Sequence, residues 1–136
     1  MEIWKTMDGD LRKIFHEHLD GHWQAVETGG TGKGIPDSNY CIDGYEGWVE
    51  FKYTKHWKVR IWPEQVAWME RRARQGGRVF IAVRRGQDEL WILTPEAGRY
   101  LREGTLKDVP KEYIKARYND GMKSWNWKEI TKILIE

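Results

Sequence analysis

The sequence has little cysteine and no long hydrophobic run. Cys41 is the only cysteine among 136 residues, which excludes an intrachain disulfide and fits a reducing compartment. No segment approaches the roughly 20 apolar residues that a membrane-spanning helix requires. The amino-terminal stretch MEIWKTMDGD contains no apolar run. We therefore expect no signal peptide, no membrane partner and a cytoplasmic location.

The chain also lacks a strong excess of charge, low-complexity tracts and internal repeats. Its 23 Lys and Arg residues nearly balance 21 Asp and Glu residues, so the net charge is only +2. Apolar residues make up 40% of the chain, and nine tryptophans add to them the bulk that one hydrophobic core needs. The sequence predicts a single domain over residues 1–136.

Basic side chains are concentrated between residues 52 and 85, where the only acidic residues are Glu64 and Glu70. The basic residues are Lys52, Lys55, Lys58, Arg60, Arg71, Arg72, Arg74, Arg78, Arg84 and Arg85. A solvated helix face gives such a pattern, and so does a surface that faces phosphate groups. The charge pattern by itself favours neither interpretation.

Hydrophobic periodicity predicts a first helix from about Met7 to Asp20, ended by Gly21. Its apolar stripe consists of Met7, Leu11, Ile14, Phe15 and His18. The elements that follow are predicted strands at 22–28, 35–42 and 47–54, with a glycine-rich loop at 29–34. The last two strands are joined by a turn at Asp43 and Gly44.

In the second half of the chain, Pro63 suits the first turn of a helix that runs to about Gln75. The elements predicted after it are strands at 78–85 and 89–94, a short helix from Pro95 and a last helix at 127–135. Asn126 and Glu129 resemble a capping box for this last helix, with a final strand as the alternative. The whole pattern predicts an α/β fold with a mixed sheet of about five strands flanked by helices.

Charged residues occupy the strands around residue 50, where apolar residues would pack more easily. Alternation places Glu50 and Lys52 together on one face of strand 47–54, opposite the face of Phe51. No other Asp or Glu in the chain has a Lys two positions later. Antiparallel pairing across the preceding turn would bring Asp37 beside this pair.

Two carboxylates beside a lysine predict a site for Mg²⁺, with Mn²⁺ as a substitute. Such an ion can polarise a phosphate oxygen and lower the pKa of a bound water. Lys52 could then orient that water or hold the phosphate as a point charge. The alternative is an ordinary ion pair between Glu50 and Lys52. It loses weight because Gly34, Pro36 and Asp37 precede the pair at close range.

The motif consists of G-I-P-D at residues 34–37 followed by V-E-F-K at residues 49–52. This arrangement resembles the signature of the PD-(D/E)XK nuclease superfamily. Within that superfamily, the chain is similar to the archaeal-type Holliday junction resolvases and the VRR-NUC nucleases over residues 7–94. The resemblance implies a restriction-endonuclease-like core and leaves residues 103–136 as a C-terminal extension.

The resemblance also implies roles for individual residues. Asp37, Glu50 and the backbone carbonyl of Phe51 would bind the metal ion, and Lys52 would position the nucleophilic water. Gln65 matches a helix glutamine of the VRR-NUC pattern that helps to orient the site. A surface glutamine in the first turn of a helix is the alternative.

The junction resolvases use one more acid, a glutamate on the first helix eleven residues before the glycine that ends it. Counted back from Gly21, this position is Asp10. Because aspartate is shorter than glutamate, we expect Asp10 to act on the metal through a water. Glu17 is the alternative, since it lies on nearly the same flank of the helix.

DNA contacts are expected beside the catalytic strand. Glycines in the 29–34 loop would let backbone N–H groups approach phosphates, a flexible linker without contacts being the alternative. The expected DNA-binding side chains are Thr28, Thr31, Lys33, Lys55, Lys58 and Arg60.

A group of histidines and a group of tryptophans suggest other kinds of site. His16, His18 and His22 do not converge on one helix face, and no second cysteine exists to complete a zinc site. Exposed tryptophans could stack on unpaired bases, although packing in the core and at its rim is the favoured role for most of them. The candidates are Trp48, Trp57, Trp62 and Trp68.

The sequence therefore predicts a Mg²⁺-dependent DNA endonuclease. The favoured hypothesis is a homodimeric Holliday junction resolvase that acts in DNA recombination and repair. It would work in a bacterial, archaeal or phage-infected cell, and apolar residues of 103–136 are candidates for its dimer surface. Two alternatives stay open. One is a nickase, flap nuclease or restriction-like nuclease of the same fold, and the other is a module that binds DNA without cutting it.

Overall fold

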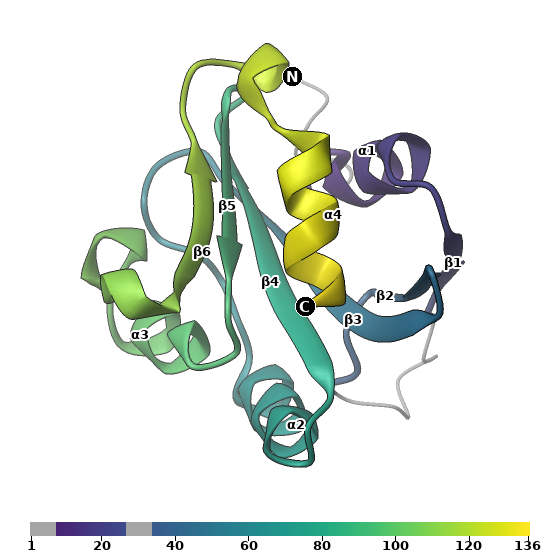
Figure 1. Ribbon diagram of the computed structural model, residues 1–136. Coiled ribbons are helices and arrows are strands. Elements are labelled where there is room, and N and C mark those ends of the chain that lie inside the picture. The colour runs from purple at the N-terminus through teal and green to yellow at the C-terminus, as the bar shows by residue number, and fades with distance from the viewer. Residues whose placement is uncertain (1–7, 27–33) are drawn as a thin grey trace.

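The computed structural model describes residues 8–26 and 34–136, which build a six-stranded mixed sheet with helices on both faces (Figure 1). The strands are β1 (His22–Ala25), β2 (Ser38–Ile42), β3 (Tyr45–Thr54), β4 (Arg78–Arg85), β5 (Glu89–Leu93) and β6 (Ile114–Tyr118). The helices are α1 (Leu11–His18), α2 (Pro63–Arg74), α3 (Ala97–Glu103) and α4 (Trp127–Ile135). The predicted α/β class is confirmed, with six strands instead of five.

The six strands lie side by side in the order in which they occur in the chain. β3 and β4 pair in parallel, and the other neighbours among the described strands pair antiparallel. A parallel pair requires a crossover connection, which here contains α2. The apolar run of β4 is therefore buried on both faces, as expected for a central strand.

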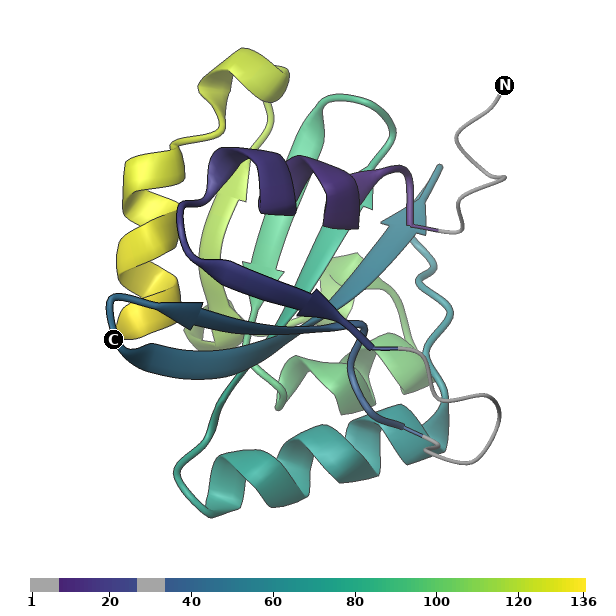
Figure 2. The ribbon, with the colours of Figure 1, turned by 90° about the vertical axis from the view of Figure 1, so that its right-hand side faces the viewer.

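Two hydrophobic cores lie on opposite faces of the sheet. On one face, α1 and α4 pack against β3 through residues such as Phe15, Phe51 and Ile130. On the other face, α2 and α3 pack through Met69 and Leu101. Figure 2 shows α1 and α2 on either side of the sheet. Because β3 belongs to both cores, its side chains alternate between the two layers.

The predicted boundaries hold for most elements, but the first helix begins later than expected. It starts at Leu11 because Gly9 and Asp10 both have a φ of 63°, which no α-helix accommodates. Met7, which the sequence pattern placed on this helix, lies outside the described residues. The predicted strand at 22–28 corresponds to β1, which is described as far as Ala25.

The C-terminal segment is part of the domain core and not an appendage. β6 is the sixth strand, which the sequence interpretation did not predict, and it pairs with the edge of β5. The residues of this segment that are buried in the chain's own core are Leu106, Val109, Trp125, Ile130, Ile133 and Leu134. These apolar residues are therefore not available as the dimer surface that the sequence suggested.

The last helix is confirmed as a helix, and polar contacts fix both of its ends. At its start, Asn126 Oδ1 accepts the backbone N–H of Glu129 at 3.0 Å. Near its end, the buried Tyr40 hydroxyl on β2 donates to the Leu134 carbonyl at 2.6 Å. Within residues 8–26 and 34–136, no helix is long and apolar enough to cross a membrane.

Replacing Tyr40 with Phe should lower the free energy of unfolding by about 1–2 kcal/mol, because the Leu134 carbonyl would remain buried without its donor. Chemical denaturation of the two proteins measures the difference. Tyr45→Phe is the matched control, since Tyr45 is exposed, and it should change stability by less than about 0.5 kcal/mol. Equal stability of Tyr40→Phe and wild type would mean that this contact does not hold α4 to the sheet.

Candidate active site

An open pocket of about 480 Å³ lies beside β3, where both β2 and α2 begin. It is lined by Asp8, Arg12, Asp37, Glu50, Phe51, Lys52, Tyr53, Arg60, Trp62 and Gln65. These residues come from the segment before α1, from α1 itself, from the segment before β2, from β3 and from the segment around the start of α2. The tertiary fold thus gathers the four predicted residues Asp37, Glu50, Lys52 and Gln65 in one place.

Glu50, Lys52 and Gln65 form a closed polar triangle. The Lys52 ammonium lies 3.3 Å from Glu50 Oε2 and donates to Gln65 Oε1 at 3.0 Å. The amide of Gln65 donates to the same Glu50 oxygen at 2.8 Å. Gln65 is therefore not a free surface glutamine, because it fixes both charged groups relative to each other.

Gln65 reaches the site because of its place in α2. It is the third residue of the helix, and its Oε1 also accepts the backbone N–H of Trp62 at 3.0 Å. This satisfies one of the N–H groups that a helix start leaves without a partner. One side chain thus caps α2 and holds the two charged residues of β3.

Asp37 stands beside β3 because β2 begins one residue later. Ser38 pairs with Val49, so the next position along β3 toward the pocket lies next to Asp37. There Asp37 Oδ2 accepts the backbone N–H of Phe51 at 2.9 Å. The Phe51 ring packs against Phe15 in the core, and hence the backbone of Phe51 is what borders the pocket.

Residues 34–37 can lie against the start of α2 because residue 34 is a glycine. Its φ is +88°, and a Cβ there would lie 2.2 Å from the Glu64 carbonyl oxygen in the first turn of α2. Any side chain would therefore push this segment away from α2. The glycine of the G-I-P-D motif thus lets the segment that carries Asp37 pack directly on the helix that carries Gln65.

The carboxyl groups of the pocket resist ionisation. Glu50 is only 2% exposed, and its burial raises its pKa to about 8, with the nearby Asp37 carboxylate adding to the shift. Burial also raises the pKa of Asp37, against the opposing effects of the Phe51 N–H and the Lys52 ammonium. The single positive charge of Lys52 therefore does not balance the two negative charges that Asp37 and Glu50 carry when both are ionised.

One buried oxygen of Glu50 is a candidate ligand for a cation. Glu50 Oε1 is buried without a hydrogen-bond partner among the described residues. Within residues 8–26 and 34–136, no group of three His, Cys, Asp or Glu side chains is arranged so that it could hold a metal ion. Mg²⁺, however, is commonly held by one or two carboxylates together with water and phosphate oxygens. Glu50 and Asp37, with the backbone carbonyl of Phe51, fit such a partial shell.

Neither of the two acids that the sequence suggested on the first helix borders the pocket. Asp10 and Glu17 are exposed, and neither lines the pocket. Asp8 lines it, and its carboxylate accepts the backbone N–H groups of Asp10 and Arg12 at 3.0 and 3.3 Å. Burial, and to a smaller extent the Asp37 carboxylate, raises the pKa of Asp8. Asp8 is thus an acid of the pocket whose ionisation is coupled to that of Asp37.

Asp8 was missed because the helix was expected to begin at Met7. With that start, Asp8 would lie inside a helix and not ahead of one. The turn at Gly9 and Asp10 places it before the helix instead, where aspartate is a favoured capping residue. The buried Arg84 holds this turn by donating to the Gly9 carbonyl at 2.7 Å. The D-G-D sequence was the signal that could have revealed the late start.

The expected DNA-binding residues separate into three groups. Arg60 is exposed and lines the pocket, and Lys55 is exposed nearby. The structure gives Lys58 another role, because its ammonium donates to three backbone carbonyls at the end of α3, those of Leu101, Arg102 and Gly104. Thr28, Thr31 and Lys33 lie outside the described residues.

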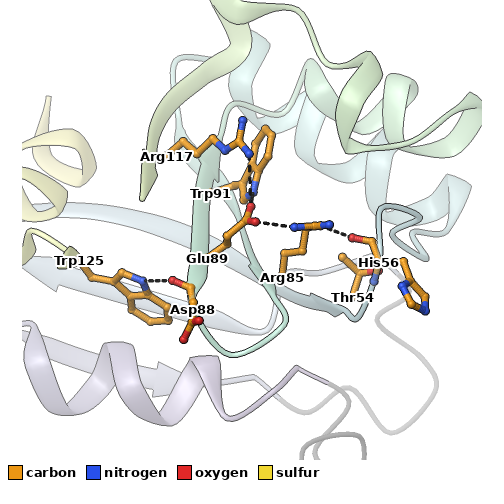
Figure 3. A network of polar contacts seen from close by, with 8 residues as sticks. All are labelled: Thr54, His56, Arg85, Asp88, Glu89, Trp91, Arg117 and Trp125. Carbon is orange, nitrogen blue, oxygen red and sulfur yellow. Dashed lines mark hydrogen bonds and ion pairs between the residues drawn. The ribbon is translucent and has the colours of Figure 1, made fainter. Parts of the chain in front are cut away.

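Several arginines of the basic stretch are engaged within the protein, whereas Arg71 and Arg74 on α2 are exposed. Arg85 donates to the His56 carbonyl and to Glu89, which also accepts the indole N–H of Trp91 at 3.0 Å (Figure 3). The Arg85 guanidinium also lies 3.6 Å from the centroid of the Trp57 ring. The run of basic residues is therefore not one continuous phosphate-facing surface.

Comparison with known proteins does not add a relative. A scan against protein-family models finds no match, and a search of curated proteins finds no significant match. Function has to be argued from the geometry of the pocket and from the motif in the sequence.

Without metal, the protein should lose stability as the pH rises from about 4.5 to about 8, because the folded state keeps a proton on Glu50 that the unfolded chain releases. Glu50→Gln removes this titration, so its stability should vary less over the same window. At pH 8 in EDTA it should exceed wild type by at least about 1 kcal/mol. Denaturant unfolding across this pH range measures both effects.

Glu46→Gln is the matched control, since Glu46 lies on the same strand but is exposed, and it should keep the wild-type slope. Adding Mg²⁺ should raise the melting temperature of wild type more than that of Glu50→Gln, because only an ion bound to the folded state stabilises it. Identical pH profiles for wild type and Glu50→Gln would show that Glu50 is already ionised in the folded protein.

Proposed function

We propose that this protein is a divalent-metal-dependent DNA endonuclease. The observation that carries the proposal is the buried Glu50 carboxylate, which has one unpartnered oxygen and lies against the Lys52 ammonium in an open pocket. Burying a carboxyl group lowers the stability of a small domain. Groups with strongly shifted pKa values are concentrated at functional sites. The order Asp37, Glu50, Lys52 also resembles the PD-(D/E)XK nuclease signature.

A bound divalent ion would supply Lewis-acid activation for phosphodiester hydrolysis. The protein's own contribution begins with Lys52, whose ammonium has three N–H donors. Two of them are directed at Glu50 and Gln65, which leaves the third for a phosphate oxygen or the attacking water. Because Gln65 fixes the lysine, this third donor has a defined direction when substrate arrives.

The expected reaction is in-line attack of water on phosphorus. A P–O bond forms to the water oxygen and the P–O3′ bond breaks, so that O3′ leaves and takes up a proton. The products carry 5′-phosphate and 3′-hydroxyl ends. Arg12 and Arg60 line the pocket, and in this proposal they would bind phosphates next to the one that is cut.

Within this class, the motif resemblance favours a Holliday junction resolvase, which would be a cytoplasmic homodimer that makes two coordinated nicks in branched DNA. A nickase, flap nuclease or restriction-like nuclease with the same restriction-endonuclease-like core is the second candidate. A DNA-binding module that does not cut is the third, and the intact set of Asp37, Glu50 and Lys52 argues against it.

Replacing Glu50 or Lys52 with alanine should lower the cleavage rate in Mg²⁺ by at least about a hundredfold, because each supplies charge at the reacting phosphate. DNA binding in EDTA should stay nearly unchanged, since phosphate affinity comes mainly from basic side chains elsewhere. Lys128→Ala, on the exposed side of α4, is the control and should cut like wild type. A Lys52→Ala protein that cuts at the wild-type rate would remove Lys52 from the mechanism.

The substrate class can be tested by offering four-way junctions, flaps, nicked duplexes and linear duplexes with Mg²⁺. A resolvase should be dimeric in solution, bind the junction more tightly than a duplex of equal length, and make paired nicks symmetric about the branch point. A monomer with equal affinity for junction and duplex would favour the second candidate. DNA binding with no cleavage of any substrate would favour the third.

A further inference from the structure

Trp62 is placed unlike the other tryptophans that the structure describes. It is 53% exposed, whereas the other described tryptophans are buried or half-buried. Its side chain lines the candidate active-site pocket together with Tyr53 and Arg60. An exposed tryptophan ring at the rim of a pocket can stack on a ligand that enters the pocket, and tryptophan is enriched at binding surfaces.

The backbone of Trp62 is fixed directly to the catalytic groups. Its N–H donates to Gln65 Oε1, the same oxygen that accepts the Lys52 ammonium. Pro63 follows it, and Trp62 has the extended φ and ψ of −94° and 151° that a residue before proline favours. The backbone of Trp62 is therefore fixed next to the groups that hold Lys52 and Glu50.

A cation accompanies the ring. The Arg60 guanidinium lies 5.9 Å from the centroid of the Trp62 ring, and both side chains are exposed. Aromatic rings next to an arginine are typical of sites that bind single-stranded nucleic acid, where bases stack on the ring and the arginine contacts the backbone. Bases inside a continuous duplex cannot stack in this way, because their faces are covered by neighbouring base pairs.

We propose that Trp62 and Arg60 form a stacking platform for an unpaired base adjacent to the phosphate that is cut. This inference rests on the proposed nuclease function and specifies its substrate. The protein would act on DNA with at least one unpaired or displaced nucleotide next to the cleavage position. Continuous duplex would be a poor substrate, since it has no free base to occupy the platform.

Tyr45 provides a matched control for the effect of an exposed aromatic ring next to an arginine. It is also an exposed aromatic residue, at 44%, and the Arg78 guanidinium lies 4.8 Å from its ring centroid. Tyr45 lies at the start of β3, however, and does not line the pocket. Any effect that comes only from an exposed ring next to an arginine should appear at both positions.

The test is a binding experiment in EDTA, so that it does not depend on cleavage. The probes are a duplex with one unpaired 2-aminopurine nucleotide and a fully paired duplex of the same sequence. Wild type should bind the first probe more tightly and quench its 2-aminopurine fluorescence by stacking. Trp62→Ala should lose roughly tenfold in affinity for the first probe, keep its affinity for the paired duplex and abolish the quenching.

Trp62→Phe should retain most of the preference, because it keeps a ring, and Tyr45→Ala should behave like wild type. Loss of affinity for both probes by the same factor in Trp62→Ala would overturn the inference, as would equal binding of both probes by wild type. Wild type that cuts paired and unpaired DNA equally well would overturn it while leaving the nuclease proposal intact. Stacking that depends on Trp62 in a protein that never cuts would support the platform and reject the nuclease.

Discussion

The burial of the Glu50 carboxylate is the constraint on which the arrangement of this protein depends. It lies on β3, one of the central strands that contribute to both cores, and it is only 2% exposed, so forming the sheet removes this acid from water. Lys52 offsets part of the cost, and the Gln65 amide offsets more by donating to the same oxygen. Since Gln65 is also the cap of α2, the start of this helix and the state of the carboxylate are coupled. Replacing Gln65 would disturb both.

The parts of the fold that follow from local chemistry could be predicted from the sequence. β4 is an uninterrupted apolar run, α2 begins at Pro63, and α4 begins after a capping Asn126, so each carries its own signal. The core of the candidate site was also predictable, because strand alternation puts Glu50 and Lys52 on one face. The turn at Asp43 and Gly44 then determines the register that brings Asp37 beside them.

The rest depended on contacts between distant parts of the chain. β6 is a half-buried edge strand whose pairing with β5 gives it its structure, and its short alternating sequence is a weak signal alone. Asp8 reaches the pocket because the turn at Gly9 is held by the buried Arg84, which comes from β4, 75 positions later in the chain. The ammonium of Lys58 is captured by the end of α3, which lies more than 40 positions later in the chain. None of these partners can be read from neighbouring residues.

The distribution of positive charge bears on how such a protein would recognise DNA. The guanidinium groups of Arg84 and Arg85 lie over aromatic rings, and Arg84 also donates to a backbone carbonyl. Such contacts fix the side chains and leave them less able to bind a phosphate. Arg60 and Arg12 differ because they border the pocket itself. Positive charge that could face phosphate would then come from Arg12 and Arg60 at the rim of the pocket and from the exposed Arg71, Arg72 and Arg74 on α2. If the protein is the proposed nuclease, it would gain little from a long regular duplex, and its binding would depend on the local geometry of the DNA strand at the pocket.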